Sequence, residues 1–307
     1  MYYFIVNEHG GSGKAKKTWN TVKRLMRENN IEYKAWKSEG EGHATKLVKR
    51  ILETENEEEM RLVVVGGDGT FNEALNGISD FDRVRVGLVP TGSGNDFARG
   101  AGIPQDTRQA LEKILYSKEA REMDLGLVTT DAGERRVFAI SSGIGLDAIV
   151  CKKVTGSKLK SILNRLQLGK FSYILMTVYT VFSMEYVKVK ASFDGKEPVA
   201  YDRLIFLAGM NMKTEGGGVP MAPEAKHDDG LLSVCIASGL PKWRAFLALP
   251  QLMIAKHTSI KGFSIVNCRD IDITAEKPVI LHADGEYGGE VSHVHITCLE
   301  KKLHMML

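Results

Sequence analysis

The segment from Val63 to Glu73 reads Val-Val-Val-Gly-Gly-Asp-Gly-Thr-Phe-Asn-Glu, and it constrains the fold more than any other part of the sequence. Three β-branched residues are typical of the end of a buried strand, and the glycines that follow allow a tight turn close to a ligand. Apolar residues then recur at the spacing of one helix face: Phe71, Ala74, Leu75 and Ile78. A helix that begins at Thr70 favours an anion at the turn, through its positive end and its free N–H groups. The segment predicts a phosphate-binding turn, although an ordinary strand-to-helix connection has a similar pattern.

Strand and helix patterns alternate through the first third of the chain. The predicted strands are Tyr2–Asn7, Ile31–Lys37, Arg61–Val65 and Val84–Pro90. The predicted helices are Ala15–Glu28 and His43–Leu52, with others from Thr70, from about Gly94 and from Thr107. Such alternation is typical of a mainly parallel sheet with helices on both faces, where ligands bind beyond the carboxyl ends of the strands. We therefore expect an α/β domain over residues 1–126.

The pattern changes after about Asp124, where short β-type runs separated by turns replace the alternation. The runs are Val137–Ser141, Val187–Phe193, Leu204–Ala208, Leu232–Ile236, Ser264–Val266, Ile271–Thr274 and Val279–His282. Many short strands of this kind predict an antiparallel β-sandwich, here over residues 127–299. A second domain also fits the length of 307 residues, because a single core rarely grows beyond about 250–300 residues.

Composition and charge argue against several classes of function. The four cysteines show no Cys-x-x-Cys spacing, so neither a zinc knuckle nor a disulfide framework is indicated. The net charge of +3 is too small to indicate a nucleic-acid partner. The N-terminus lacks a signal-peptide pattern, and the apolar run from Tyr173 to Phe182 is far shorter than the ~20 residues of a membrane-spanning helix. We expect a cytoplasmic protein with reduced cysteines.

Four ordered segments resemble the signatures of the diacylglycerol kinase catalytic-domain family, which is related to sphingosine kinases, ceramide kinases and, more distantly, NAD kinases. They are Gly66–Glu73, Pro90–Arg99, Ala225–Leu232 and Asp284–Glu286. The resemblance covers nearly the whole chain. It implies a nucleotide-binding domain over residues 1–126 that is completed by about 300–307. It also implies a β-sandwich over 127–299 that supplies a metal site and a catalytic base, with the active-site cleft between the two.

The resemblance further implies that the turns of the first domain bind ATP. The residues concerned are Asn7, Gly11, Ser12, Gly13, Lys14, Thr45, Gly66, Gly67, Asp68, Gly69, Thr70, Asn72, Glu73, Ser93 and Asn95. Thr45 and Ser93 are also good N-caps, so helix capping is an alternative role for both. The first loop departs from the family pattern, because Glu8-His9 follows Asn7 where the family usually has an Asn-Pro pair. It also lacks the spacing of a P-loop.

Kinases neutralise the charge on the transferred phosphoryl group, usually with Mg²⁺ held by carboxylates and water. The resemblance assigns this ion to the Asp229 carboxylate and the main-chain carbonyls of Lys226 and Leu231, a small set that suits an ion retaining several waters. Three further carboxylates would then act through water: Asp68, Asp96 and Asp124. Asp228-Asp229-Gly230 is also a strong signal for a hairpin turn, and both roles are compatible.

Transfer to an alcohol also requires a base near the hydroxyl. Asp284 and Glu286 are two residues apart, so in an extended segment both carboxylates lie on the same side and Gly285 leaves room for a substrate. The resemblance places the proton acceptor in this triplet, and we favour Glu286 slightly over Asp284. The alternative is that Asp-Gly here is merely a turn.

Two stretches without acidic residues suggest the substrate. Leu231–Arg269 and Cys151–Met184 combine lysines and arginines with apolar residues and contain no Asp or Glu. Such stretches suit a protein that rests on an anionic lipid surface, where each Lys or Arg contributes about 1 kcal/mol. Helices that simply pack on the second domain with solvated lysines would show the same composition.

The sequence therefore predicts an ATP- and Mg²⁺-dependent lipid kinase, most simply one that converts diacylglycerol to phosphatidic acid. A sphingoid base or a polyprenol is an alternative acceptor, and NAD kinase is the nearest enzymatic rival. A catalytically silent lipid- or nucleotide-binding regulator is a further alternative. We expect a peripheral protein at the inner face of the plasma membrane. The sequence is compatible with a homodimer but does not determine the oligomeric state.

Overall fold

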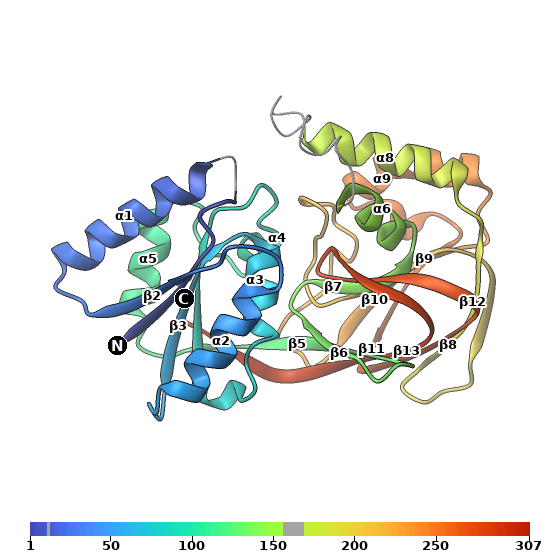
Figure 1. Cartoon of the computed structure of the whole chain (residues 1–307). Helices are drawn as coiled ribbons and strands as arrows, with labels where there is room; N and C mark the ends of the chain where they lie inside the picture. The colour runs from blue at the N-terminus through green and yellow to red at the C-terminus, as the bar shows by residue number, and fades with distance from the viewer. Residues whose placement is uncertain (11–12, 156–168) are drawn as a thin grey trace. The chain divides into compact units, whose positions relative to one another are not determined.

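The chain forms two compact units, described here from a computed structural model (Figure 1). The structure describes residues 1–10, 13–155 and 169–307. The first unit contains Met1–Asp124 and the C-terminal Lys301–Leu307, and the second contains Leu125–Glu300.

The first unit is built on a parallel sheet with the order β13-β4-β3-β1-β2. Its strands are β1 (Tyr2–Val6), β2 (Tyr33–Lys37), β3 (Met60–Gly66), β4 (Val84–Pro90) and the end of β13 (Glu286–Met305). All residues of β1 are buried, as are all but one of β3, which is typical of a sheet covered on both faces. The carboxyl ends of β1, β3 and β4 therefore lie side by side at one edge.

Helices follow β1, β2, β3 and β4. They are α1 (Lys14–Glu28), α2 (His43–Thr54), α3 (Asp68–Leu75), α4 (Asp96–Gly100) and α5 (Thr107–Tyr116), and a 3-10 turn η2 (Phe81–Arg83) precedes β4. Trp19, Val22 and Met26 form one apolar stripe of α1 and pack on Phe4 and Val6 of β1. The helix predicted from Thr70 begins two residues earlier, at Asp68, so the Asp-Gly pair lies within its first turn.

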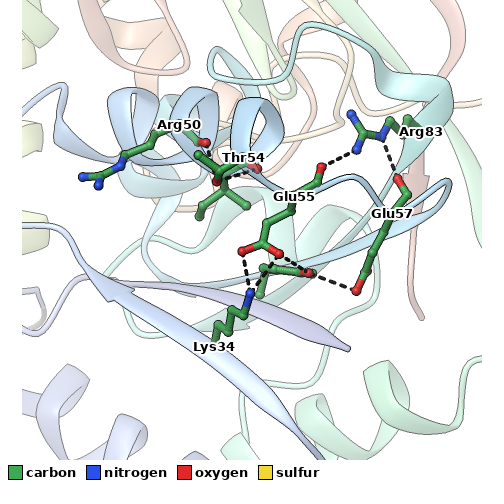
Figure 2. A network of polar contacts seen from close by, with 8 residues as sticks. Lys34, Arg50, Thr54, Glu55, Glu57 and Arg83 are labelled. Atoms are coloured by element: carbon green, nitrogen blue, oxygen red, sulfur yellow. Dashed lines mark hydrogen bonds and ion pairs between the residues drawn. The ribbon is translucent and has the colours of Figure 1, made fainter.

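A polar network lies at the opposite end of this sheet, just before β3 begins (Figure 2). The buried Tyr3 hydroxyl donates to the carboxylates of Glu55 (3.1 Å) and Glu57 (2.9 Å), and Lys34 pairs with Glu55 at 2.6 Å. Arg83 donates to the main-chain oxygens of Glu57 (2.8 Å) and Glu55 (2.5 Å). Burial, together with the two carboxylates, raises the pKa of Tyr3, so the phenol remains a donor. The network fixes the α2–β3 connection away from the glycine-rich turns.

The second unit is mostly antiparallel. Its strands are the last part of β5 (Arg121–Thr130), β6 (Arg135–Phe138), β7 (Ser141–Gly145), β8 (Val187–Phe193), β9 (Val199–Met210), β10 (Leu232–Ser238), β11 (Phe263–Cys268), β12 (Asp270–Ala283) and the first part of β13. The main path runs β11-β10-β9-β7-β12-β13, with β8 paired to both β12 and β9 and β5 paired to β6.

Two predictions for this unit are corrected by the structure, and one long strand lies outside the predicted runs. The runs Ile271–Thr274 and Val279–His282 belong to one strand, β12, which continues through the polar residues between them. The run Val137–Ser141 is divided between β6 and β7. The strand β13, 20 residues long, was not predicted, because its many charged and glycine residues hide the alternation.

Helices α6 (Leu146–Thr155), α8 (Gly169–Ser183) and α9 (Lys242–Met253) also belong to this unit, with a 3-10 turn η3 (His257–Ser259) after α9. Figure 1 shows α8 and α9 side by side. Apolar residues of α6, α8 and α9 pack on β9 and β10, and a separate core lies among β8, β12 and β13. The chain thus combines an α/β domain with an antiparallel β-sandwich-like domain, as the sequence predicts.

Among the helices in the described ranges, none is long and apolar enough to cross a lipid bilayer.

Candidate functional site: glycine turns in the first unit and an acidic turn in the second

Two glycine-rich turns meet at the carboxyl edge of the parallel sheet. Gly67 follows β3 and Gly92 follows β4, and a Cβ atom added to Gly67 would lie 3.0 Å from the Gly92 Cα. A Cβ on Gly92 would lie 2.9 Å from the Gly67 Cα and 2.7 Å from Asn95 Oδ1. The N–H of Thr91 donates to the Gly66 carbonyl at 2.9 Å. The absence of side chains therefore lets the two backbones touch, as a phosphate-binding surface made of main-chain groups requires.

The first loop joins the same edge through Asn7. Its side-chain amide donates to Thr70 Oγ1 at 2.9 Å, and its oxygen accepts the His9 N–H at 3.0 Å. Gly13 adopts a left-handed conformation at the N-cap of α1, and Lys14 is the exposed first residue of that helix. Gly11 and Ser12, also predicted to bind ATP, lie outside the described residues.

Two buried oxygen atoms at these turns have no hydrogen-bond partner within the described part of the chain. They are Thr91 Oγ1 and Asn95 Oδ1, and the exposed fractions of these residues are 0% and 4%. Asn95 is held by its amide, which donates to Gln105 Oε1 at 2.8 Å. A buried polar atom normally finds a partner, so these oxygens indicate that a ligand group or water belongs here. The sequence prediction missed Thr91, although it stands between a strand end and two glycines of the second signature.

The acidic residues of the first signature cap neighbouring helices. Asp68 accepts the N–H groups of Asp96 (3.0 Å) and Phe97 (3.2 Å) at the start of α4. Glu73 accepts the N–H groups of Gly42 (2.8 Å) and Ala44 (3.1 Å) with its two oxygens, and so caps α2. Glu73 therefore has a structural role that its predicted contact with ATP did not include.

The capping alternative for Thr45 and Ser93 is wrong. The N-cap of α2 is Gly42, and Thr45 lies inside that helix with its hydroxyl donating to the Glu73 carbonyl at 2.7 Å. Ser93 is exposed and precedes Asn95, which is the N-cap of α4. Their contacts with ATP stay predictions.

The other polar residues predicted near the nucleotide also have protein partners. Asn72 is fully buried, and its Oδ1 lies 3.3 Å from the Asn76 amide. The nearly buried Asp96 pairs with Arg99 at 2.7 Å. Asp124 is fully buried and accepts the Lys301 N–H at 2.7 Å, where the C-terminal residues rejoin the first unit. A role through water for Asp68, Asp96 and Asp124 stays a prediction.

Asp229 lies in an exposed turn directly before β10. One carboxylate oxygen accepts the Leu231 N–H at 3.1 Å, which orients the side chain, and Gly230 has a φ of +73°. The predicted hairpin at this place is wrong, because the described strand that precedes the turn ends at Met210 and the turn follows a long irregular connection. Within the described residues, no three His, Cys, Asp or Glu side chains form a metal cluster. The predicted ligand set has only one side chain, so this finding does not exclude it.

The acidic triplet is the turn of the β12–β13 hairpin. Ala283 pairs with Glu286, and the intervening Asp284 and Gly285 have φ values of +51° and +78°. Positive φ at both positions is typical of the two-residue Asp-Gly turn that matches strand twist. The predicted extended conformation, with both carboxylates on one side, is therefore wrong, and the turn alternative is correct.

The two acids of the turn consequently differ. The Asp284 carboxylate accepts three main-chain N–H groups, from Ala139 (2.9 Å), Ile140 (2.7 Å) and Ser141 (3.1 Å). The Asp284 N–H in turn donates to the Ser141 carbonyl at 2.8 Å. Asp284 thus fastens the hairpin to the start of β7, and the half-buried Glu286 follows at the first position of β13.

A polar cluster under this turn was not predicted. His282 Nε2 lies 3.0 Å from Asp147 Oδ2, and the Ser141 hydroxyl donates to the Glu215 carboxylate. His282 is 1% exposed. The histidine precedes the acidic triplet by two residues, but Asp147 and Glu215 lie far away in sequence and carry no motif that would have marked them.

Comparison with known families agrees with these features. The model of the diacylglycerol kinase catalytic domain matches residues 1–128, and that of the YegS C-terminal NAD kinase beta sandwich-like domain matches residues 140–306. These two domains together define a class of kinases that use ATP. The chain belongs to the lipid kinase family of the diacylglycerol kinase catalytic domain.

Curated relatives cover almost the whole chain. The Bacillus subtilis protein named "Putative lipid kinase YtlR" is 28% identical over 291 residues, which are 94% of both chains. The diacylglycerol kinase of Staphylococcus saprophyticus is 28% identical over 290 residues, which are 94% of this chain and 89% of the relative.

Solved structures show the same fold. A crystal structure described as a putative diacylglycerol kinase from Bacillus anthracis has a TM-score of 0.76 at 23% identity and covers 99% of this chain and 96% of its own. An NAD kinase from Archaeoglobus fulgidus in complex with ATP has a TM-score of 0.52 at 14% identity, with 100% of this chain and 94% of its own covered.

Proposed function

We propose that this chain transfers the γ-phosphoryl group of Mg²⁺-bound ATP to the hydroxyl of a lipid alcohol, and that diacylglycerol is the acceptor and phosphatidic acid the product. The observation that carries the proposal is the meeting of Gly67 and Gly92 beside the oxygens of Thr91 and Asn95, which have no hydrogen-bond partner among the described residues. The names of the relatives support diacylglycerol as the acceptor.

The nucleotide-binding half of the reaction falls to main-chain groups. The N–H groups of the turns after β1, β3 and β4 suit phosphate oxygens, and Lys14 adds a positive charge at the start of α1. The turns after β3 and β4 are held by the strand ends and by the hydrogen bonds of Asp68 and Asn7, so their N–H groups are positioned without ATP. Preordered donors lose little freedom on binding and orient the γ-phosphoryl group.

Asp229 and the carbonyls of Lys226 and Leu231 form the proposed Mg²⁺ site. The exposed Asp229 carboxylate has the hard oxygen atoms that Mg²⁺ prefers, and its hydrogen bond to the Leu231 N–H holds it at the turn. A bound Mg²⁺ ion would neutralise charge on the phosphates during transfer. A single carboxylate suffices, because Mg²⁺ keeps most of its water shell.

Glu286 is the proposed base that takes the proton of the lipid hydroxyl. The choice over Asp284 follows from the three N–H groups that the Asp284 carboxylate already accepts. Those bonds occupy the Asp284 oxygens with the main chain of residues 139–141. Asp284 therefore supports the turn, and Glu286 acts at its edge.

Incubation of the purified chain with labelled ATP and Mg²⁺ tests the acceptor. Vesicles would carry diacylglycerol, a sphingoid base and a polyprenol, with NAD assayed in parallel. We expect label in phosphatidic acid, loss of labelling in EDTA, and a large loss in Asp229→Ala but not in the neighbouring Asp228→Ala. Label on NAD and not on lipid would overturn the substrate. An absence of labelled product would support a silent regulator.

We further propose that the chain reaches its substrate by binding peripherally to the anionic inner face of the plasma membrane. The contact surface, called here the α8–α9 face, consists of exposed apolar residues of these helices: Tyr179, Phe182, Trp243, Phe246 and Leu247. Trp243 and Leu247 are 55% and 60% exposed and lie four residues apart, on one side of α9. Large apolar side chains in such a cluster usually mark a contact surface.

Contacts within the α8–α9 face support an anionic membrane. The rings of Phe182 and Phe246 join the two helices, with centroids 5.7 Å apart. Arg244 lies over the Trp243 ring at 5.1 Å, and Lys153 of α6 lies over the Tyr179 ring at 4.9 Å. Cations that alternate with aromatic rings suit the boundary between phosphate headgroups and acyl chains.

Vesicle sedimentation tests this surface. We expect stronger binding to vesicles of phosphatidylglycerol and phosphatidylcholine than to phosphatidylcholine alone, and about a tenfold loss in Leu247→Glu, because an apolar contact is replaced by a repelled charge. Tyr116→Glu is the matched control, since Tyr116 is 69% exposed on α5 of the first unit. Equal binding of both variants would contradict the proposed face.

A further inference from the structure

An ion pair lies beneath the Asp284–Gly285 turn and has no part in the proposed proton transfer. His282 is the second-last residue of β12, and its Nε2 lies 3.0 Å from Asp147 Oδ2. Asp147 stands in the first turn of α6, where the helix N-terminus favours a negative charge. The exposed fractions of the two side chains are 1% and 10%, so the pair is shielded from water.

The neighbouring strand leaves room for this pair. His282 is opposite Gly143 in the antiparallel pairing of β12 with β7. A Cβ atom on Gly143 would lie 2.9 Å from Asp147 Oδ2, closer than carbon and oxygen can approach without displacement. The Ser142 hydroxyl also donates to the main-chain oxygen of His282 at 2.7 Å. The backbone and the ring of His282 are thus both held.

Carboxylates from three elements act on the His282 ring: Asp147 of α6, Glu215 of the connection after β9, and Asp284 of the turn. Burial by itself lowers the pKa of His282, but these carboxylates outweigh burial and raise the pKa to about 9. The ring is therefore a cation at neutral pH, and it compensates part of the negative charge gathered under the turn.

The ring also faces the turn itself. The Gly285 nitrogen lies 3.4 Å from His282 Nδ1, a separation that suits a weak N–H donation to a neutral ring. That contact opposes the charged ring, whereas the 3.0 Å contact with Asp147 favours it. The shorter contact decides the protonation state, because a buried hydrogen bond between two ions is the stronger one.

We propose that His282, held by Asp147, is a positioning residue for the phosphoryl transfer, because it fixes the turn that leads into Glu286. This inference rests on the proposed function of Glu286. Neither His282 nor Asp147 is assigned a contact with ATP or lipid. They act through the Asp284–Gly285 turn, which is also held by the bonds of the Asp284 carboxylate to the Ala139 and Ile140 N–H groups.

A pH dependence follows from this arrangement. His282 keeps its charge below pH 9 and loses it as the pH rises through about 9. Loss of the ring proton removes the cation that attracts the carboxylates of Asp147, Glu215 and Asp284, and this loss outweighs the weak hydrogen bond that the neutral Nδ1 accepts from the Gly285 N–H. We therefore expect kcat to fall on this alkaline limb, while the KM for ATP stays constant because the glycine turns belong to the other unit.

Kinase assays with diacylglycerol from pH 6 to 10 test the proposal. In His282→Gln, kcat should fall about tenfold or more without a change in the KM for ATP, and the alkaline limb should disappear. In Asp147→Asn the limb should move to lower pH, since the main charge that stabilises the imidazolium is gone. His295→Gln is the matched control, because His295 forms a 2.9 Å pair with Asp272 between β12 and β13 that is only half-buried. Unchanged limbs in His282→Gln and Asp147→Asn would overturn the proposal.

An NMR titration of the His282 ring uses the wild-type chain. It depends neither on kinase activity nor on whether a substituted protein folds. A midpoint near pH 9 supports the buried cation, and a midpoint at or below the ordinary 6.5 overturns it. Failure of the two ideas is distinguishable. If Glu286→Gln transfers phosphate normally, the proposed function of Glu286 falls and the positioning role falls with it. If Glu286→Gln is inactive while His282→Gln is fully active at every pH, only the positioning role fails.

Discussion

The two units hold their functional turns by different means. In the first unit, adjacent parallel strands bring three turns to one edge, and Gly67 and Gly92 touch through their backbones. In the second unit, one hairpin turn is held by side chains, with the Asp284 carboxylate on three N–H groups and the His282–Asp147 pair beneath.

The two turns should therefore respond differently to substitution and to pH. A turn defined by backbone contact has no titrating group in the contact itself, so it should be sensitive to an added Cβ atom and insensitive to pH. A turn defined by buried charges should depend on pH. The four predictions below, ordered by expected effect, test this contrast.

The largest effect is expected from Asp284→Asn. Asparagine also tolerates the positive φ of this position, so the substitution changes the charge and not the backbone. Loss of charge-assisted bonds to three N–H groups should lower the free energy of unfolding by about 4 kcal/mol, measured by urea denaturation. Asp194→Asn is the matched control, because Asp194 begins another Asp-Gly turn with a φ of +52° but is exposed. Equal losses in both variants would contradict the special role of the buried turn.

The next effect concerns pH. Because the pKa of His282 is raised from 6.5 to about 9, its charge stabilises the folded state fully below pH 6.5 and stops doing so as the pH rises through about 9. Between pH 6.5 and 9.5, the wild type should lose about 3 kcal/mol of unfolding free energy relative to His282→Gln. Urea denaturation at the two pH values measures this difference. A constant difference would show that the ring does not titrate in this range.

Gly92→Ala probes the backbone-defined half. The new Cβ atom meets Asn95 Oδ1 and the Gly67 Cα at less than 3.0 Å, so the two turns must separate. Displacement of the N–H groups that we propose to bind phosphate should lower kcat/KM for ATP about 100-fold at every pH. Gly40→Ala is the matched control, because a Cβ atom at Gly40 has no neighbour within 4 Å. A normal kcat/KM in Gly92→Ala would break the comparison.

Glu73→Gln should have the smallest effect. A neutral side chain still reaches Gly42 or Ala44 but loses the charged cap of α2, at a cost of about 1 kcal/mol in thermal or urea unfolding. The KM for ATP should stay within about twofold, because the Glu73 carboxylate accepts the Gly42 and Ala44 N–H groups and so has a structural role. Glu53→Gln, an exposed position of α2, controls for the change of charge. A large rise in KM with normal stability would instead support the direct contact with ATP that the sequence suggested.

Prediction from the sequence was accurate where the signal is local. Apolar periodicity gave β4 with its observed bounds and β3, α1 and α2 to within two residues, because each pattern and its structure involve the same residues. The glycine turns were also recognised, since strand, turn and helix follow one another directly.

The protein partners of the acidic residues could not be predicted from the sequence. The sequence marks Asp68, Glu73 and Asp284 as acids beside glycine, but the N–H groups that they accept lie 28 to 145 residues away. His282 and Asp147 are likewise separated by 135 residues and meet only because β12 pairs with β7. The extended Asp284–Glu286 segment was wrong for a local reason, since Asp-Gly adopts positive φ in a two-residue turn.

The central claim is that the first unit binds ATP and that Glu286 of the second unit accepts the proton of the lipid hydroxyl. Measurement of ATP affinity and of phosphoryl transfer to diacylglycerol in Glu286→Gln tests it most directly, with Glu290→Gln of the same strand as control. We predict an unchanged ATP affinity and a transfer rate lower by about 100-fold or more in Glu286→Gln, with neither changed in Glu290→Gln. A Glu286→Gln protein that phosphorylates diacylglycerol at the wild-type rate would contradict the account.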